Sequence, residues 1–328
     1  MSATADPAMS AVLEVTGLTV DFQAAGGWYR ALDGATLRLG PGETVGLVGE
    51  SGSGKSTLAL AAGGLLPPNA RMEGDVRVGG VSVIGGITDE LRSVRQRYLG
   101  FVFQSPAAAL DPTRTVETLL RDVDADEGQI AALLQQVALP PARRILKSYP
   151  HELSGGMAQR VAIAIAIARR PRLVIADEPT ASLDSSVRQQ ILALLFGLRA
   201  KIGASVLFLS HDIGSVGRFC DRVAVMYAGR IVEDGPARAV LRHPTHPYTA
   251  ALLATAPGTE QATGRLEPIP GVPPLLRGRS EACAFAPRCR FATEICTSVR
   301  PQPRALGAQS VVCHRASELS LSSPLVSV

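Results

Sequence analysis

The sequence lacks any apolar run of the roughly 18–20 residues that a membrane-spanning helix requires. Its longest candidates, "VAIAIAIA" and "ILALLFGL", have eight residues each. The N-terminal "MSATADPAMSA" also lacks the charged start and apolar stretch of a signal peptide. We therefore expect residues 1–11 to form a short disordered lead and the chain to be soluble and cytoplasmic. If the chain serves a membrane process, partner chains must supply the membrane spans.

A strong excess of either charge is missing as well. Charged residues make up 19% of the 328 residues, and the formal net charge is only +4. This balance is too mild to indicate a nucleic-acid partner, and we expect none. Hydrophobic residues, at 46%, are ample for a buried core. The length fits one large domain with an appendage, or two domains.

Short runs rich in Val, Leu and Ile alternate along the chain with segments of helical length. The periodicity of "VAIAIAIA" fits a strand or a helix, and its length and flanks favour the helix. Alternating strands and helices predict an α/β fold with a mostly parallel sheet. The expected strands include "ETVGLVG", "LGFVFQ", "RLVIADEP" and "SVLFLSHD", with a hairpin at "GDVRVGGVSVIG". The expected helices are "STLALAAGGLL", "SGGMAQRVAIAIAIARRP" and "SSVRQQILALLFGLRAKIG", with a helical insertion from Thr115 to Leu139.

Beyond Pro244 this alternation ceases. Proline, glycine and arginine become frequent, and "EPIPGVPPLLRGR" is expected to be an extended connector. We place a domain boundary near residue 257.

A glycine-rich loop, "GESGSGKS" (Gly49–Ser56), lies between an expected strand and an expected helix. This is the context of a phosphate-binding (Walker A) loop, whose backbone N–H groups and helix start favour an anion. Lys55 would reach the β- and γ-phosphates, and the Ser56 hydroxyl would ligate Mg²⁺. The nucleotide contacts expected here are Gly49, Glu50, Ser51, Gly52, Ser53, Gly54, Lys55, Ser56 and Thr57.

A second element of a nucleotide site is "LVIADE", an apolar strand that ends in two acids. Asp177 is placed to hold Mg²⁺, directly or through water. Glu178 is placed to polarise an attacking water.

Further motifs identify the kind of NTPase. "ELSGGMAQR" (Glu152–Arg160), together with the phosphate-binding loop before it and "DEP" after it, resembles the ATP-binding cassette (ABC) ATPases. Four other positions match motifs of that family in the right order: Gln104 its Q-loop, Ser182–Asp184 its D-loop, His211 its switch histidine, and Phe22 its adenine-stacking aromatic, although Trp28 and Tyr29 lie close to Phe22.

The resemblance implies a P-loop NTPase cassette with a mostly parallel sheet core, a helical subdomain at about 105–170 and an antiparallel β subdomain. It also implies a head-to-tail dimer, in which each ATP lies between one chain's phosphate-binding loop and Ser154, Gly155 and Gly156 of the other, with Asp184 nearby. Gln104, which would also ligate Mg²⁺, and His211 would sense the γ-phosphate. Since both acids and the histidine are present, the chain is expected to hydrolyse ATP.

The flanking stretches resemble one branch, the ATP-binding subunits of bacterial oligopeptide, dipeptide and nickel importers. They are "GLVGESGSGKSTLA", "FVFQSPAAALDP", "YPHELSGGMAQR", "HPTHPYTAALLATAP" and "IPGVPP". This implies a cassette at 12–256 and an extension at 257–328, on the cytoplasmic face of the inner membrane. The implied partners are a second ATPase subunit, two permeases and an extracytoplasmic binding protein.

Two departures from the branch accompany these matches. The insertion at 115–139 is shorter than usual, which puts permease docking in doubt, and Ala158 replaces a larger polar residue. The alternatives are a soluble ABC ATPase of DNA repair or translation, a chiefly metal- or redox-responsive module, and an importer of nickel or another solute.

Cysteine is scarce, with five residues in the whole chain, yet four of them lie near its end. In a reducing cytosol such a cluster indicates metal ligation before disulfides. The intervals of five, six and sixteen residues exceed the spacing common in zinc sites. The set comprises Cys283, Cys289, Cys296 and Cys313, whereas Cys220 is expected to be a buried structural thiol.

Four cysteines are the usual ligands of an iron–sulfur cluster, and members of the resembled branch can carry one in this tail. Arg288 and Arg290 could offset its charge, or form a solvated basic loop. Zinc, with His314 replacing one cysteine, and free thiols are the alternatives. A structural role is expected, because the tail has few apolar residues of its own.

Overall fold

The computed structural model describes residues 11–86, 88–123, 126–139, 143–181, 183–256 and 268–323. The expected disordered lead lies outside this part of the chain except for Ala11, as does the boundary expected near 257. The chain divides into two compact units. The first unit comprises Met1–Val12, Gly40–Gly42 and Ile87–Leu207, and the second comprises Leu13–Leu39, Glu43–Gly86 and Phe208–Val328. None of the helices in the described residues has the length and apolar character needed to cross a bilayer.

The strands of the first unit are rich in Val, Leu and Ile, as the sequence predicts. They are β6 (Leu99–Val102), β7 (Leu173–Asp177) and β8 (Ser205–Leu209), in the order β8-β7-β6, with the end of β8 belonging to the second unit. β6 and β7 are parallel, with Leu99 opposite Leu173. Every residue of β7 is buried, which explains its unbroken apolar run.

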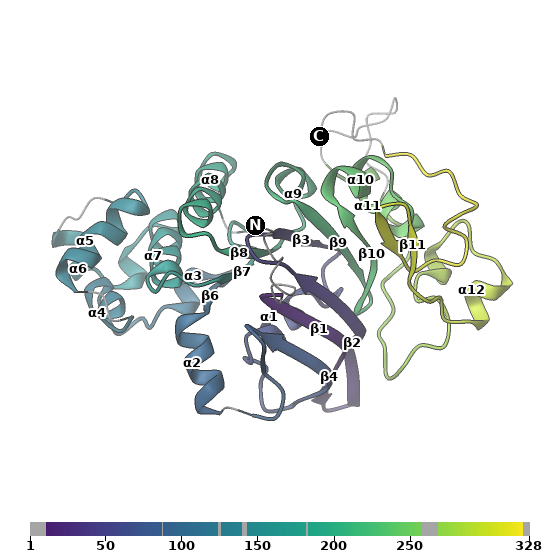
Figure 1. The fold of residues 1–328 in the computed structure, drawn as a ribbon, viewed down its shortest axis with the longest axis horizontal. Helices are drawn as coiled ribbons and strands as arrows, with labels where there is room; N and C mark the ends of the chain where they lie inside the picture. Colours follow the sequence, from purple (N-terminus) through teal and green to yellow (C-terminus); the bar gives the residue numbers. More distant parts are fainter. Residues whose placement is uncertain are drawn as a thin grey trace, which may run out of the picture. The chain divides into compact units, whose positions relative to one another are not determined.

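Helices make up most of the rest of the first unit, and α4 to α7 gather together in Figure 1. The stretch "VAIAIAIA" lies in α7, so the prediction of a helix from its length and flanking residues is confirmed. Ser154 caps this helix, with its Oγ accepting from the Met157 N–H at 3.3 Å. The expected insertion forms α4 and α5. The elements are α2 (Asp89–Arg97), α3 (Pro106–Ala109), α4 (Val116–Arg121), α5 (Glu127–Gln136), α6 (Arg143–Lys147), η1 (Pro150–Glu152), α7 (Gly155–Ile167) and α8 (Ser185–Ile202).

The second unit contains the expected antiparallel β sheet, seen as β1, β2 and β4 in Figure 1. Its order is β2-β1-β4-β5. Alternating burial along these strands places one face of the sheet against the core. The predicted hairpin is confirmed as β4 and β5. The strands are β1 (Leu13–Ala24), β2 (Gly27–Leu39), β4 (Ala70–Val78) and β5 (Val81–Ser82).

A second set of strands in this unit follows the order β11-β12-β10-β9-β3. β3 and β9 are parallel, whereas β10 is antiparallel to both β9 and β12. The mixed sheet agrees with the α/β fold class. The elements are β3 (Thr44–Val48), α1 (Lys55–Ala62), α9 (Ile213–Phe219), β9 (Arg222–Tyr227), β10 (Arg230–Pro236), α10 (Ala237–Arg242), α11 (Pro247–Ala254), η2 (Ala286–Arg288), α12 (Glu294–Ser298), β11 (Arg304–Leu306) and β12 (Gln309–Val311).

Short regular elements follow Pro244. α11 begins at Pro247, and the tail adds the β11–β12 hairpin to β10, with Glu233 opposite Val311. The Val312 N–H donates to the Val232 carbonyl at 2.8 Å. The tail therefore shares the sheet of the second unit, and sheet pairing supplies part of the stabilisation that the sequence assigned to a metal.

Candidate functional site

The phosphate-binding loop connects β3 to α1 within the second unit. Gly54 caps α1 in the left-handed region, with φ 108°. A Cβ at this position would come within 2.8 Å of both the Ala31 carbonyl oxygen and Leu32 Cδ2. Glycine is therefore required here by conformation and by space. Gly52 also has positive φ, 77°, but a Cβ there would meet nothing within 4 Å.

Lys55 is held against the backbone of this loop. The residue is 6% exposed, and its Nζ donates to the carbonyls of Gly49 at 2.8 Å and Glu50 at 3.1 Å. The Ser53 N–H donates to the Glu50 carbonyl at 3.2 Å. The buried Ser53 Oγ lacks a hydrogen-bond partner in the described residues. A glycine-rich loop that combines a lysine with the N-terminus of a helix can bind a phosphate group.

The aromatic candidates for adenine stacking lie on one hairpin. Phe22 on β1 is directly opposite Tyr29 on β2, and both side chains are half-buried. Trp28 is more exposed and has the Arg71 guanidinium 4.2 Å from its ring centroid. Phe22 thus keeps part of its ring accessible.

His211 follows β8 in the second unit and is exposed. Next to it, the Asp212 N–H donates to Ser210 Oγ at 2.9 Å, which fixes the turn after the strand.

The two predicted acids lie in the first unit, at the end of β7. Asp177 is buried with 7% exposure, whereas Glu178 is half-buried. Glu178 has φ 42°, a left-handed conformation that non-glycine residues seldom adopt. Such local strain is common where a side chain must be aimed at a ligand.

The signature motif and the D-loop segment lie next to each other in the first unit. Ser154 and Gly155 are exposed at the start of α7. A Cβ on Gly156 would come 3.1 Å from Val187 Cγ1 in the first turn of α8. Asp184 caps α8 by accepting from the Val187 N–H at 3.0 Å, and this bond and those from Ser186 lower its pKa. Ser182 lies outside the described residues.

Gln104 follows β6 in this unit and is exposed. Ala158 is buried in α7. The candidate nucleotide residues are therefore distributed over both units. The second unit holds Phe22, the loop Gly49–Thr57 and His211, and the first holds Gln104, Ser154–Gly156, Asp177, Glu178 and Asp184.

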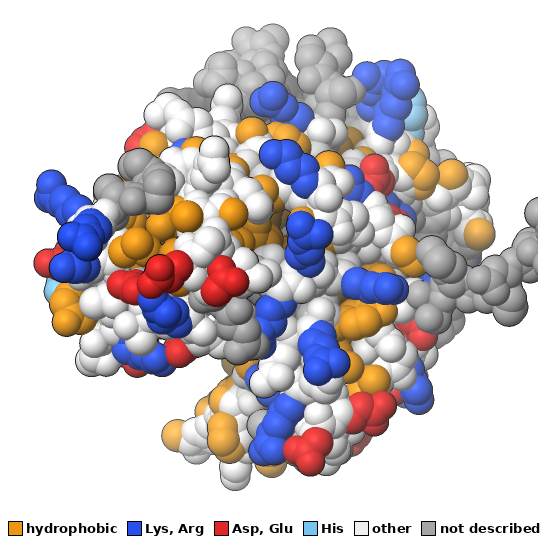
Figure 2. Space-filling view, turned by 60° about the vertical axis from the view of Figure 1, so that its left-hand side comes forward, with side chains coloured by type: hydrophobic (Ala, Val, Ile, Leu, Met, Phe, Trp, Pro, Cys, Tyr) orange, Lys and Arg blue, Asp and Glu red, His pale blue; other side chains and the backbone are white. Residues whose placement is uncertain are grey.

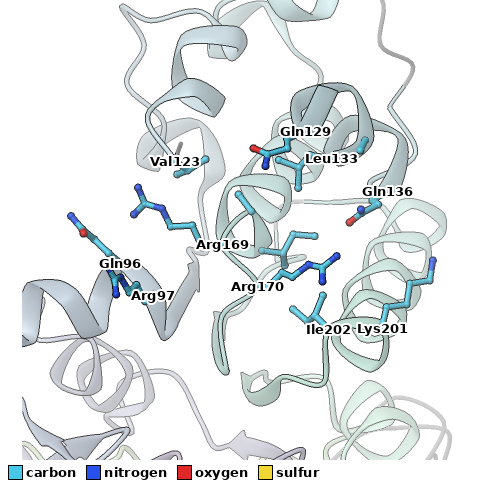
Figure 3. Close-up of a pocket in the computed structure, with 13 residues that line it drawn as sticks. Gln96, Arg97, Val123, Gln129, Leu133, Gln136, Arg169, Arg170, Lys201 and Ile202 are labelled. Atoms are coloured by element: carbon cyan, nitrogen blue, oxygen red, sulfur yellow. The ribbon is translucent and has the colours of Figure 1, made fainter. Parts of the chain in front are cut away.

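The first unit also carries a groove of about 860 Å³ between α2, α5 and the ends of α7 and α8 (Figure 3). Four cations line it: Arg97, Arg169, Arg170 and Lys201. It contains none of the predicted site residues.

Over the face in Figure 2, basic side chains are spread among acidic and apolar ones.

The four tail cysteines line one small cavity of about 20 Å³ in the second unit, together with His314. All are free thiols. Cys296 and Cys313 are buried, and burial raises the pKa of the thiols of Cys283, Cys289 and Cys313.

These cysteines are not arranged as a site for one metal ion. No three His, Cys, Asp or Glu side chains in the described part of the chain form a group that could hold a metal ion. The His314 Nε2 is engaged with the Val299 carbonyl at 2.8 Å. Cys220, as expected, is buried; its Sγ would be 3.1 Å from a Cβ added to Gly46.

Sequence reasoning missed two partners of the phosphate-binding loop. The Glu50 N–H donates to Tyr248 Oη at 2.9 Å, and the Glu50 carboxylate pairs with Arg288 from the tail. Nothing local to Glu50 indicates either contact, because they join positions 198 and 238 residues apart.

Comparisons with known proteins identify similar families and folds. Residues 32–181 match the family described as ABC transporter, and residues 232–296 match the oligopeptide/dipeptide transporter C-terminal region. A candidate peptide import ATP-binding protein of Brucella abortus is 45% identical over 89% of this chain and 90% of its own length. The oligopeptide transport ATP-binding protein of Salmonella typhimurium is 41% identical over 88% of this chain and 89% of its own. A solved dimeric ATP-binding cassette, bound to ADP and phosphate after hydrolysis, aligns with TM-score 0.60 and 30% identity over 69% of this chain and 99% of its own.

Proposed function

The chain belongs to the ABC transporter family, in its oligopeptide/dipeptide branch, and from this premise we propose that it binds and hydrolyses ATP to drive uptake of peptides. The observation that carries the proposal is the phosphate-binding loop, in which Lys55 is already held beside the loop carbonyls. The buried Ser53 hydroxyl, which has no hydrogen-bond partner among the described residues, adds a polar group that a nucleotide phosphate could satisfy.

The residues then take the following roles. Lys55 neutralises the β- and γ-phosphates, and the loop N–H groups orient them. Ser56, Asp177 and Gln104 hold Mg²⁺, which neutralises charge that develops on the phosphates. Glu178, aimed by its left-handed backbone, polarises the attacking water. Gln104 and His211 respond to the γ-phosphate, and Phe22 stacks on adenine.

The second half of each ATP site comes from another ATPase subunit. Ser154 and Gly155 are exposed at the N-terminus of the 13-residue α7, so this helix start is accessible to a γ-phosphate presented by a partner. The similar solved cassette is itself a dimer. ATP binding closes the dimer, and hydrolysis removes the phosphate that holds it together.

Two substitutions test this division of roles. Lys55→Ala removes a cation from the phosphate site, so the isolated chain should bind ATP more weakly. Ser154→Arg places a bulky cation at an exposed helix start, so the isolated chain should bind ATP normally while dimer closure and hydrolysis are lost. ATP titration and gel filtration with MgATP measure both. Loss of ATP binding by the isolated Ser154→Arg chain would show that the trans assignment is wrong.

The membrane partners are two permeases fed by an extracytoplasmic binding protein, and the chain acts at the cytoplasmic face of the inner membrane. The similarity to peptide-import proteins supports a peptide solute. Copurification of permeases is the expected result. Recovery of nucleic acid in their place would instead favour a non-transport ABC ATPase. Uptake of nickel by the complex would show that the transported solute is nickel and not a peptide.

The division into a cassette at 12–256 and an extension at 257–328 also remains a proposal. Pairing of β12 with β10 supports an extension docked on the cassette.

We propose in addition that the four tail cysteines hold an iron–sulfur cluster. Two observations support this proposal: all four thiols line one cavity, and four cysteines are the usual ligand set of such a cluster. When bound, the cluster would crosslink the segments of the tail and would take no part in ATP hydrolysis. Anaerobic purification followed by iron, sulfide and zinc analysis tests this. About four irons and four sulfides per chain are expected, and one zinc without sulfide would refute the cluster.

A further inference from the structure

The phosphate-binding loop is joined to the cysteine tail by an ion pair. Arg288, the last residue of η2, donates from Nη1 to Glu50 Oε2 at 2.7 Å and from Nη2 to Glu50 Oε1 at 2.9 Å. The Arg288 side chain is only 4% exposed, and that of Glu50 is 27% exposed. Two parallel bonds between a planar guanidinium and a carboxylate fix both the distance and the orientation of the groups. The pair thus fixes the side chain of the second loop residue.

Glu50 is also central to the hydrogen bonds of the loop backbone. Its N–H donates to Tyr248 Oη at 2.9 Å, and its carbonyl accepts from Lys55 Nζ at 3.1 Å and from the Ser53 N–H at 3.2 Å. A displacement of Glu50 would move the carbonyl on which the phosphate-binding lysine rests. Arg288, Glu50 and Lys55 are thus linked by successive hydrogen bonds.

Arg288 is itself held rigidly by its surroundings. Its Nε donates to the Pro270 carbonyl at 2.8 Å and its Nη2 to the Ile269 carbonyl at 3.2 Å. Its guanidinium carbon lies 5.7 Å from the centroid of the Tyr227 ring. A side chain whose rotamer is locked by three sets of contacts can position another group, because little of its own freedom remains.

The tail reaches this place through an aromatic cluster. Phe285, three residues before Arg288, packs edge-on against Tyr227 at 5.2 Å and Tyr248 at 5.4 Å between ring centroids. Phe285 also lines the cavity of the four cysteines. The segment that carries Arg288 therefore contacts both the cysteine cavity and the aromatic side chains next to the loop, through Phe285.

We propose that Arg288 is a positioning residue for nucleotide binding: through its bidentate pair with Glu50 it holds the phosphate-binding loop in the conformation that receives ATP. This inference rests on the proposed ATP binding. It makes the tail part of the nucleotide site without contact between Arg288 and the nucleotide.

The alternative is that the pair only stabilises the fold. A purely stabilising pair would change the midpoint of unfolding but leave unaltered the ATP affinity of the folded molecules. A positioning pair changes the affinity, and it does so through Glu50. The two roles are separated by measuring both quantities in single and double variants.

The experiment uses the full chain and titration with a fluorescent ATP analogue in the presence of Mg²⁺, with urea unfolding of each variant in parallel. Arg288→Met and Glu50→Gln should each raise the dissociation constant on the order of tenfold, within the usual range for coupled sites. The double variant should be no weaker than the single ones, because either change breaks the same pair. Arg288→Lys keeps the positive charge but cannot form two parallel hydrogen bonds, so its dissociation constant should lie between those of the unchanged chain and Arg288→Met.

Arg290→Ala is the matched control, since it removes the same charge from an exposed position two residues along the same tail. It should bind the analogue as the unchanged chain does. If Arg288→Met fails to fold, Glu50→Gln and Arg288→Lys decide the question, because both keep a polar group at the buried site.

The outcomes separate this inference from the proposed function. If the unchanged chain does not bind the analogue, the proposed ATP site itself is refuted. The same holds if the Lys55→Ala variant binds the analogue as tightly as the unchanged chain. An unchanged chain that binds, with Arg288 or Glu50 variants as tight as Arg290→Ala, overturns only the positioning role. Additive effects of the two substitutions would also overturn it, since the residues would then act independently.

Discussion

Replacing Asp33 by asparagine tests how the tail is attached to the rest of the second unit. Asp33 lies on β2 with a side chain 2% exposed. Its carboxylate pairs with Arg230 of β10, with Arg300 of the tail at 3.0 Å and with Arg30 at 3.4 Å. Arg300 also donates to the Asp33 carbonyl at 2.9 Å. One buried carboxylate thus joins strands of the cassette to a residue 267 positions away.

The substitution keeps the shape of the side chain but removes the carboxylate that all three guanidinium groups contact, while Arg30 keeps its pair with Asp21 at 2.8 Å. The three arginine side chains are 7%, 18% and 14% exposed, so water compensates them poorly. Breaking a buried ion pair by removing one partner costs about 3–5 kcal/mol. We therefore expect Asp33→Asn to lower the free energy of unfolding by about 3 kcal/mol at pH 7.

Asp75→Asn is the matched control. Asp75 pairs with Arg77 at 2.8 Å, but the side chains are 45% and 48% exposed, and such pairs contribute about 0–1 kcal/mol. Urea unfolding at pH 7 compares the two variants with the unchanged chain. If Asp33→Asn costs no more than Asp75→Asn, the network does not anchor the tail.

The pH dependence of the same difference follows from the pKa of Asp33. Burial alone raises this pKa, but the hydrogen bond and charge of Arg230 and the charge of Arg300 outweigh it, and the pKa is lower than that of an ordinary aspartate. A lowered folded-state pKa gives stability that is present above the unfolded value, about 3.9, and is lost as pH falls through the folded value. The difference between the unchanged chain and Asp33→Asn should therefore be constant above about pH 5 and shrink below about pH 4. A difference that grows on acidification would contradict the assignment.

Three other changes test the site and the fold. Glu178→Gln should reduce ATP turnover by the assembled importer about 10²–10⁴-fold while ATP affinity persists, because the carboxylate polarises water without holding phosphate; normal steady-state hydrolysis would refute this. The isolated chain should hydrolyse ATP slowly compared with the chain joined to its partners, and an equal, solute-independent rate would contradict that dependence. Gly197→Ala, at an exposed position of α8 where a Cβ meets nothing within 4 Å, should raise the free energy of unfolding by about 0.5–1 kcal/mol, as thermal unfolding can measure.

Local patterns were sufficient where local physics determines the structure. Ser154 caps α7 because its hydroxyl reaches an N–H three residues along the chain, and this is visible in sequence. β7 was predictable because a strand buried on both faces must be apolar throughout. The glycine-rich loop itself was recognisable from its sequence, whereas the lack of space for a side chain at Gly54 comes from Ala31 and Leu32, which are distant in the sequence.

The tail was not predictable in this way, because its structure depends on distant partners. β11 and β12 have three residues each, too few for a periodic pattern, and β12 is ordered by pairing with β10. Because the tail has few apolar residues, the sequence suggested that a metal stabilises it. Its sheet pairing and the Arg300–Asp33 contact supply additional attachment that composition does not reveal.

Arg288 and Arg290 illustrate the limit most clearly. The two residues are of the same type, two positions apart, and the sequence treats them as one basic loop around the cysteines. In the fold Arg288 is buried in a pair with Glu50, whereas Arg290 is exposed beside Phe291. What separates them is a carboxylate 238 residues earlier, within the phosphate-binding loop. A cysteine cavity that only held the tail together would not need an arginine aimed at that loop. The geometry therefore connects two motifs that sequence reasoning assigned to separate roles, and nucleotide affinity is the property through which their connection can be measured.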